Sequence, residues 1–161
     1  PYCYRCPFNR AKPERADARD YRKCSWECVG KVEQAFARQK KRGEPYAAFV
    51  FEPLMQGAAG MIPQPAGWLR QVTDIARSHG ALLIADEVQT GLARTGKLWG
   101  VNHWDIEPDI IATAKSLGGG VLPVSAVTTT EEIFKPMMYP NPFMHTTTTG
   151  GGALACAAAI A

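Results

Sequence analysis

Strand-like runs alternate with helix-like segments along this chain, and this alternation restricts the possible folds more than any other feature. Residues 25–42 and 65–79 carry apolar residues at helical spacing, three and four positions apart. The strand-like runs cover 46–53, 81–86, 109–114 and 123–130. Apolar strands that alternate with helices predict an α/β fold, with a mostly parallel central sheet flanked by helices and strands buried on both faces.

Capping residues predict where the helices begin and end. The first helix is expected to take Ser25 as its N-cap and to end before Gly43, and the second to open at Pro65 and close at Gly80. A short third helix is expected after Thr129–Thr130. One face of the second helix is predicted to be buried: Trp68, Leu69, Val72, Ile75 and Ala76.

Composition indicates about one folded domain, because 46% of the 161 residues are hydrophobic and 20% are charged. Residues 1–42 hold 12 Lys and Arg against 5 Asp and Glu, yet the charges are scattered, so no nucleic-acid partner is expected. Neither a secretory signal nor a membrane-spanning apolar run is recognisable. Together with an odd number of cysteines, five, these features predict a soluble, cytoplasmic protein that does not bind membranes.

Residues 1–45 are interpreted as a cysteine-containing loop and a surface helix that lead into the main domain, residues 46–161. Cys3 and Cys6, followed by Cys24 and Cys28, approach the spacing of a zinc ribbon, so a zinc-binding module is one alternative function. The preferred interpretation contains no metal. The chain starts without Met and stops inside ALACAAAIA, which suggests an internal fragment of a longer protein.

Acidic and basic side chains follow two neighbouring strands. Asp86 and Glu87 come directly after LLIA, and Lys115 follows DIIATA, just before the glycines at 118–120. Because parallel strands end at the same edge of a sheet, we expect these groups to meet there. A lysine that is desolvated at this edge is nucleophilic toward aldehydes, and a lysine with an aspartate partner suits pyridoxal phosphate. A purely structural Asp–Lys ion pair is the other interpretation.

Four motifs resemble the class III pyridoxal-phosphate-dependent aminotransferases of fold type I. They are FEPLMQGAAGM (51–61), IADEVQTGLARTGKLWG (84–100), EPDIIATAKSLGGGVLPVSAV (107–127) and HTTTTGG (145–151). The resemblance implies that residues 46–161 are part of the large cofactor-binding domain and that pyridoxal 5'-phosphate is the cofactor. It also implies a homodimer that transfers an amino group from an amine donor, with a terminal amine, to a 2-oxo acid or aldehyde. The fragment by itself is expected to be inactive.

The resemblance also implies a role for each matching residue. Lys115 would bond covalently to the cofactor aldehyde and later move a proton during catalysis. Asp86 would keep the ring nitrogen protonated, Val88 would pack on the ring face, and Gln89 would hydrogen-bond the ring hydroxyl. Thr148 would reach the cofactor phosphate in the neighbouring subunit.

Three further motif positions carry weaker implications. Glu52 would lie near the ring, with a structural role at least as plausible as direct contact. The segment 94–96 and His145 are expected to be architectural.

Two positions depart from the family pattern. Ala58 follows Gln56–Gly57 where ornithine- and 4-aminobutyrate-type members carry an acid, which weakens both assignments. Gly152–Ala153 replaces the usual Asn-Pro. A fold-type-I racemase or decarboxylase is the alternative enzyme, because these reactions use the same lysine and aspartate.

Overall fold

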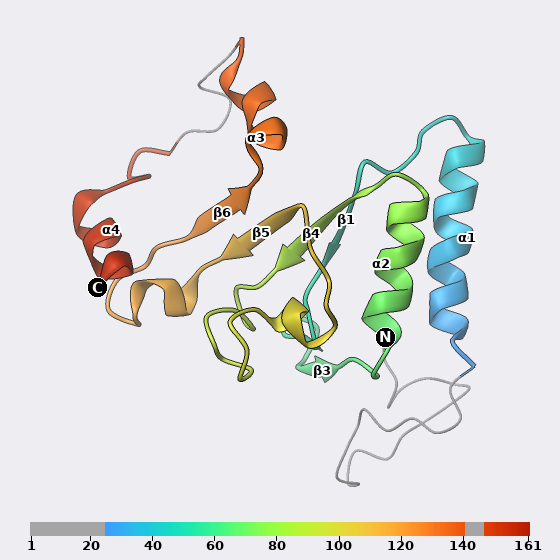
Figure 1. The fold of residues 1–161 in the computed structure, drawn as a ribbon, viewed down its shortest axis with the longest axis horizontal. Coiled ribbons are helices and arrows are strands. Elements are labelled where there is room, and N and C mark those ends of the chain that lie inside the picture. The colour runs from blue at the N-terminus through green and yellow to red at the C-terminus, as the bar shows by residue number, and fades with distance from the viewer. Residues whose placement is uncertain (1–24, 141–146) are drawn as a thin grey trace, which may run out of the picture.

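A four-stranded sheet runs through the described part of the chain, which comprises residues 25–140 and 147–161 of a computed structural model (Figure 1). Its strands are β1 (Ala48–Phe51), β4 (Leu82–Asp86), β5 (Ile110–Thr113) and β6 (Ala126–Thr129), adjacent in that order. The pairs β1–β4 and β4–β5 are parallel, and β6 is antiparallel to β5. The prediction of a mostly parallel α/β sheet is therefore confirmed.

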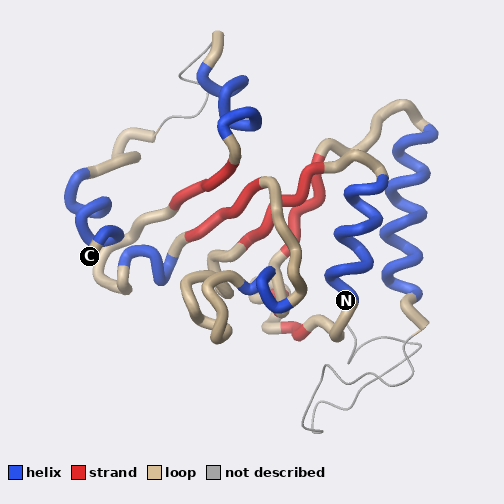
Figure 2. The backbone as a smooth tube through the Cα atoms, in the orientation of Figure 1, coloured by secondary structure: helices blue, strands red, loops and turns tan. Residues whose placement is uncertain are grey.

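Two helices lie side by side on one face of this sheet (Figure 2). Helix α1 spans Glu27–Lys41, and α2 spans Trp68–Ser78 and contacts both β1 and β4. Phe36 of α1 packs edge-on against Phe49 of β1, at a ring centroid distance of 6.2 Å. This face holds the hydrophobic core: Val29, Phe36, Phe51, Trp68, Leu69, Val72, Ala76, Ala81, Leu83, Ala85, Val101 and Ile106.

The two faces of the sheet differ in burial, which corrects the expectation of strands buried on both sides. Leu83 and Ala85 point to the helical face and are fully buried. Val50 lies opposite Ile84 in the register and belongs to the other face, where its side chain is 63% exposed. Leu82, at the start of β4, is 37% exposed. Among the described residues, helices cover the first face and leave apolar groups of the second face exposed.

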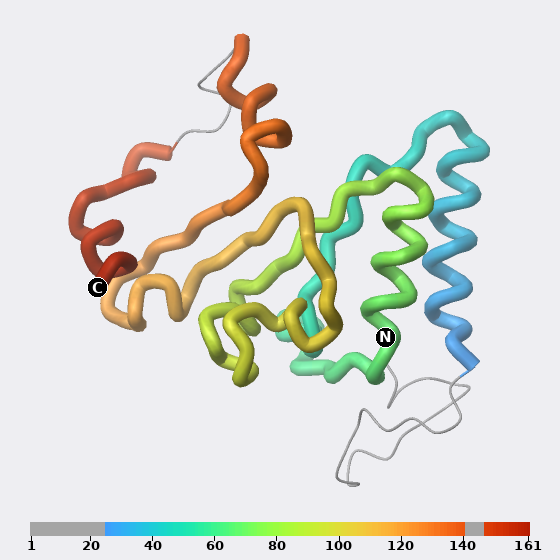
Figure 3. Tube along the Cα trace, viewed as in Figure 1, coloured from blue at the N-terminus to red at the C-terminus, as the bar shows by residue number. Residues whose placement is uncertain are grey.

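Short elements complete the described chain. The strands β2 (Met55–Gln56) and β3 (Ile62–Pro63) form an antiparallel pair after β1, which the sequence patterns did not predict. The 3-10 helices η2 (Gly100–His103) and η3 (Lys115–Gly118) follow the 87–99 loop and β5, respectively. Helix α3 spans Glu131–Met138, and the final helix α4 (Ala153–Ile160) returns to contact η3 (Figure 3).

Two predicted helix starts were wrong by a few residues. Trp26, not Ser25, is the N-cap of α1, and it has a left-handed backbone with φ 61°. Helix α2 begins after Gly67, whose φ of 81° prevents the chain from being helical as early as Pro65. Two other boundary predictions are confirmed. Gly80, the expected end of the second helix, is left-handed at φ 80°, and Thr130 is the N-cap of α3, where its hydroxyl accepts a hydrogen bond from the backbone N–H of Ile133.

The core predicts a contrast between two leucine truncations. Leu83→Ala should lower the free energy of unfolding by about 2–5 kcal/mol, because it opens a cavity between the sheet and α2. Leu98→Ala, at a side chain that is 58% exposed, should change it by less than about 0.5 kcal/mol. Urea unfolding of both variants measures the difference, and equal losses would contradict the proposed core.

Candidate active site

The parallel pairing of β4 with β5 brings Asp86 and Lys115 to one edge of the sheet. Asp86 ends β4 and pairs with Ala112 of β5, and Lys115 begins η3 directly beyond the end of β5. Both side chains therefore stand at the carboxyl ends of adjacent strands, where α/β sheets bind ligands. Glycines at 118–120 follow the lysine. In the described part of the chain, apart from the immediate chain neighbours, no heavy atom lies within 4 Å of the position that a Cβ would take at Gly119 or Gly120.

Lys115 is held by the loop that follows β4. Its Nζ donates a hydrogen bond to Oε1 of Gln89 over 2.9 Å. The lysine backbone has φ 50°, the left-handed region that non-glycine residues rarely adopt, and such strain concentrates at functional sites. The expectation of a desolvated lysine is corrected, because η3 carries Lys115 beyond the strand end and its side chain is exposed in this chain.

Asp86 makes a tight turn with the residues that follow it. Its Oδ1 accepts a hydrogen bond from the backbone N–H of Val88 over 3.1 Å, and the residue is half-buried. In the described part of the chain no ion pair joins Asp86 to Lys115, since the lysine bonds to Gln89 instead. The geometry therefore does not support the interpretation of Asp86 and Lys115 as a structural ion pair.

The sequence position of Glu87, directly after Asp86, suggested that the two carboxylates lie together at the sheet edge. The structure separates them. Its side chain is only 2% exposed and points into the protein. The carboxylate accepts hydrogen bonds from the Thr90 hydroxyl (2.6 Å) and from the backbone N–H groups of Gly100 and Val101 (2.9 Å each). The signal was present in the sequence, because Glu87 continues the alternation of buried Leu83 and Ala85 along β4.

Glu52 stands at the corresponding edge after β1. Its Oε2 accepts a hydrogen bond from the Gly57 N–H over 2.7 Å, and its backbone carbonyl accepts one from Nε2 of Gln64 over 2.5 Å. A Cβ at Gly57 would lie 3.1 Å from Oε2 of Glu52 and 3.5 Å from Oε1 of Gln89. Glu52 thus fixes the start of the turn between β2 and β3, which lies close to the glutamine that contacts Lys115.

The segment 94–96 contacts its surroundings at two points. Nε of Arg94 donates a hydrogen bond to Oγ of Ser116 over 3.2 Å, next to the lysine. Nε2 of His103 lies 3.0 Å from the carbonyl oxygen of Thr95. Sequence reasoning did not anticipate the link from Arg94 to the lysine turn.

Thr148 is exposed in the turn that precedes α4, a helix that contacts η3. His145 and three of the four clustered cysteines, Cys3, Cys6 and Cys24, lie outside the described residues. Within residues 25–140 and 147–161, no three His, Cys, Asp or Glu side chains come together as metal ligands. In the same ranges no helix is long and apolar enough to cross a membrane.

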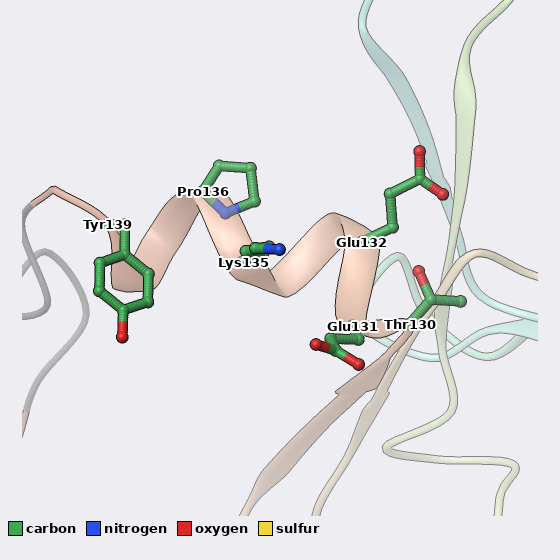
Figure 4. A pocket seen from close by; sticks show the side chains of 6 residues that line it. All are labelled: Thr130, Glu131, Glu132, Lys135, Pro136 and Tyr139. Atoms are coloured by element: carbon green, nitrogen blue, oxygen red, sulfur yellow. The ribbon is translucent and has the colours of Figure 1, made fainter.

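A hollow of about 650 Å³ lies at a different place (Figure 4). All its lining residues belong to α3 and its caps: Thr130, Glu131, Glu132, Lys135, Pro136 and Tyr139. Thr129 pairs with Ile110 at the beginning of β5, so α3 starts at the sheet edge opposite Lys115. This hollow is lined by one helix and its caps, whereas the lysine edge brings together side chains of the loop after β4 and of η3, through the Gln89–Lys115 and Arg94–Ser116 hydrogen bonds.

An α/β sheet with a lysine and an aspartate at the ends of adjacent strands is compatible with a pyridoxal-phosphate protein, because this cofactor is held by a lysine and by an acidic partner of its ring nitrogen. The family model described as Aminotransferase class-III matches residues 3–161. This chain therefore belongs to the class-III aminotransferase family, whose members use pyridoxal phosphate.

Solved structures agree with this membership. The ornithine aminotransferase from Toxoplasma gondii, whose structure shows partial occupancy of PLP at its active site, is 41% identical (TM-score 0.71, 82% of this chain, 29% of that chain). The acetylornithine aminotransferase from Elizabethkingia anophelis is also 41% identical (TM-score 0.72, 84% of this chain, 32% of that chain). An (S)-enantioselective ω-transaminase from Thermomicrobium roseum is 36% identical (TM-score 0.72, 83% of this chain, 30% of that chain). The chain thus spans about a third of the length of these relatives.

Two glycine-to-alanine substitutions test the packing of the loop after β4. A Cβ at Gly91 would lie 2.8 Å from the backbone oxygen of Glu87 and 3.0 Å from the Trp99 ring, so Gly91→Ala should cost about 1–3 kcal/mol. Gly30 lies exposed in α1 with nothing within 4 Å, so Gly30→Ala should add about 0.5–1 kcal/mol. Thermal unfolding compares them, and stabilisation by both would refute the tight loop.

Proposed function

We propose that this chain is the cofactor-binding part of a longer pyridoxal-phosphate-dependent aminotransferase. The observation that carries the proposal is the placement of Lys115 and Asp86 at one sheet edge by the β4–β5 pairing. The open space at Gly119 and Gly120 suits the close approach of a flat cofactor. The amine and the carboxylate at the same edge suit a cofactor that carries an aldehyde and a ring nitrogen. The family membership supports the same chemistry.

When bound, pyridoxal phosphate supplies an electron sink that stabilises negative charge on the substrate carbon that bears the amino group. Lys115 provides the amine that holds the cofactor covalently and the base that moves a proton at that carbon. The Asp86 carboxylate holds a proton on the ring nitrogen, and Gln89 donates a hydrogen bond to the ring hydroxyl. Val88 packs on the ring face.

Glu52 supports this site through Gly57 and Gln64 rather than by reacting. This role follows from the contact of its carboxylate with Gly57, at the turn that approaches Gln89, and from the contact of its backbone carbonyl with Gln64 beyond β3. Direct contact with the cofactor is not needed for it.

The proposed reaction moves an amino group from a donor with a terminal amine to a 2-oxo acid or aldehyde. The similarity to an ω-transaminase supports such a donor. Ala58 stands where the resemblance places an acid in ornithine-type members, so the proposal does not specify ornithine. The match to an aminotransferase family favours amino transfer over racemisation or decarboxylation with the same lysine.

Replacement of Lys115 tests the function directly. In the full-length protein, Lys115→Ala should lower turnover by at least about 10²- to 10⁴-fold, the range that a general acid–base group contributes. Lys97→Ala is the matched control, since Lys97 is also exposed and only contacts the Asn102 carbonyl. Borohydride treatment of the loaded wild type should fix the cofactor on Lys115, as identified by peptide mass spectrometry. Turnover at the wild-type rate in Lys115→Ala would reject the assignment.

We also propose that the full-length protein is a homodimer in which Thr148 binds the cofactor phosphate of the neighbouring subunit. Thr148 is exposed in a turn before α4, and α4 contacts the turn that carries Lys115. An exposed threonine hydroxyl is free to donate to a phosphate oxygen. Because such a site takes residues from two chains, the chain by itself is expected to bind the cofactor weakly and to be inactive.

Subunit mixing tests the shared site. Full-length Lys115→Ala and Thr148→Val chains are each expected to be impaired, but a heterodimer gathers both lesions in one site and leaves the other intact. After random exchange, about a quarter of all sites should be unimpaired in a two-fold symmetric dimer. Activity above the average of the two parents supports the contact. Activity at that average, with exchange verified by mass spectrometry, counts against it.

A further inference from the structure

Glu87 is the one charged side chain among the buried polar groups of the described residues, and the proposed chemistry does not use it. Both oxygens of its carboxylate accept hydrogen bonds from neutral donors: the Thr90 hydroxyl and the backbone N–H groups of Gly100 and Val101. Buried polar groups that are satisfied in this way specify one local arrangement, because the loss of any partner leaves a costly unpaired group.

These hydrogen bonds close the 87–101 loop at its base. Glu87 follows β4 directly, whereas Gly100 and Val101 begin η2 at the far end of the loop. The packing at this base is tight. A Cβ at Gly100 would lie 2.9 Å from Cβ of Thr90 and 3.0 Å from Cβ of Pro53. The two ends of the loop are therefore held together by buried contacts.

The same loop touches the lysine turn at two exposed points. Gln89 accepts from Nζ of Lys115, and Arg94 donates to Oγ of Ser116. Exposed polar contacts contribute little by themselves, because water competes for both partners. The position of Gln89 beside Lys115 thus depends on the buried base of the loop.

We propose that Glu87 is a positioning residue that acts through the 87–101 loop to hold Gln89 against Lys115. The inference deepens the proposed function and rests on it for its catalytic consequence. A carboxylate is required, since three donors converge on its two oxygens. An amide at this position would present an NH₂ group to one of the backbone N–H groups and leave it unpaired.

Four variants of the full-length protein test this role. Glu87→Gln keeps the shape of the side chain but lacks one acceptor, and Thr90→Val removes one donor. Thr90→Ser restores the hydroxyl. Thr73→Val is the matched control, because Thr73 is equally buried and its hydroxyl bonds only to carbonyls of its own helix α2.

The first readout uses cofactor-free protein. Hydrogen–deuterium exchange of peptides from the 87–101 loop should accelerate by about tenfold or more in Glu87→Gln and Thr90→Val, and stay near wild type in Thr90→Ser and Thr73→Val. Acetylation of Lys115, relative to Lys135 of α3 in the same sample, should rise more than about twofold in the first two variants, because the amine loses its fixed partner.

The second readout uses loaded enzyme. Glu87→Gln and Thr90→Val should lower kcat more than they raise KM and shift the pH midpoint of the cofactor absorbance, whereas Thr73→Val should lower only the thermal stability. Unchanged loop exchange and Lys115 labelling in folded Glu87→Gln would overturn the proposal, as would equal effects of Thr73→Val. If wild-type protein binds no pyridoxal phosphate, the proposed function fails, while exchange and labelling still decide whether Glu87 positions Lys115.

Discussion

The parallel pairing of β4 with β5 is the constraint on which the site depends. Parallel neighbours end at the same edge, so the register that pairs Asp86 with Ala112 also decides where the chain emerges toward Lys115. A shift of one residue would turn Asp86 to the opposite face of the sheet. The helical face prevents such a shift, because Leu83 and Ala85 are buried there with α2. By fixing the register, the core fixes where the residues proposed for the site are placed.

Much of the fold could be predicted because the sequence patterns of its helices and strands each lie within a short stretch of the chain. The helical spacing in 65–79 and the apolar runs at 81–86 and 109–114 are each complete within a short stretch of sequence. The pair β2–β3 was missed because two-residue strands carry no periodicity. The prediction of a mostly parallel sheet did not say which strand would be antiparallel, because strand direction follows from the path of the chain between elements and residue type says little about it.

The residues proposed for the site come from motif order, whereas most of their contacts could not be predicted from the sequence. Motif order named Lys115, Asp86 and Gln89, and the structure brings Lys115 and Gln89 into contact. Sequence position alone treated Asp86 and Glu87 as equivalent carboxylates. Alternation along β4 separates them, since Glu87 falls on the buried face and bonds to residues 13 and 14 positions later. Such pairings depend on loop closure, which local sequence does not encode.

The uncovered face of the sheet has a consequence for handling the protein. Val50 and Val127 are each more than 60% exposed, and among the described strands β1 lies at one edge of the sheet. An exposed apolar face beside an edge strand favours association with other copies of the same surface. A preparation of these 161 residues by themselves is therefore expected to self-associate through this surface. The highest concentration at which the preparation stays in solution measures how strongly the surface associates.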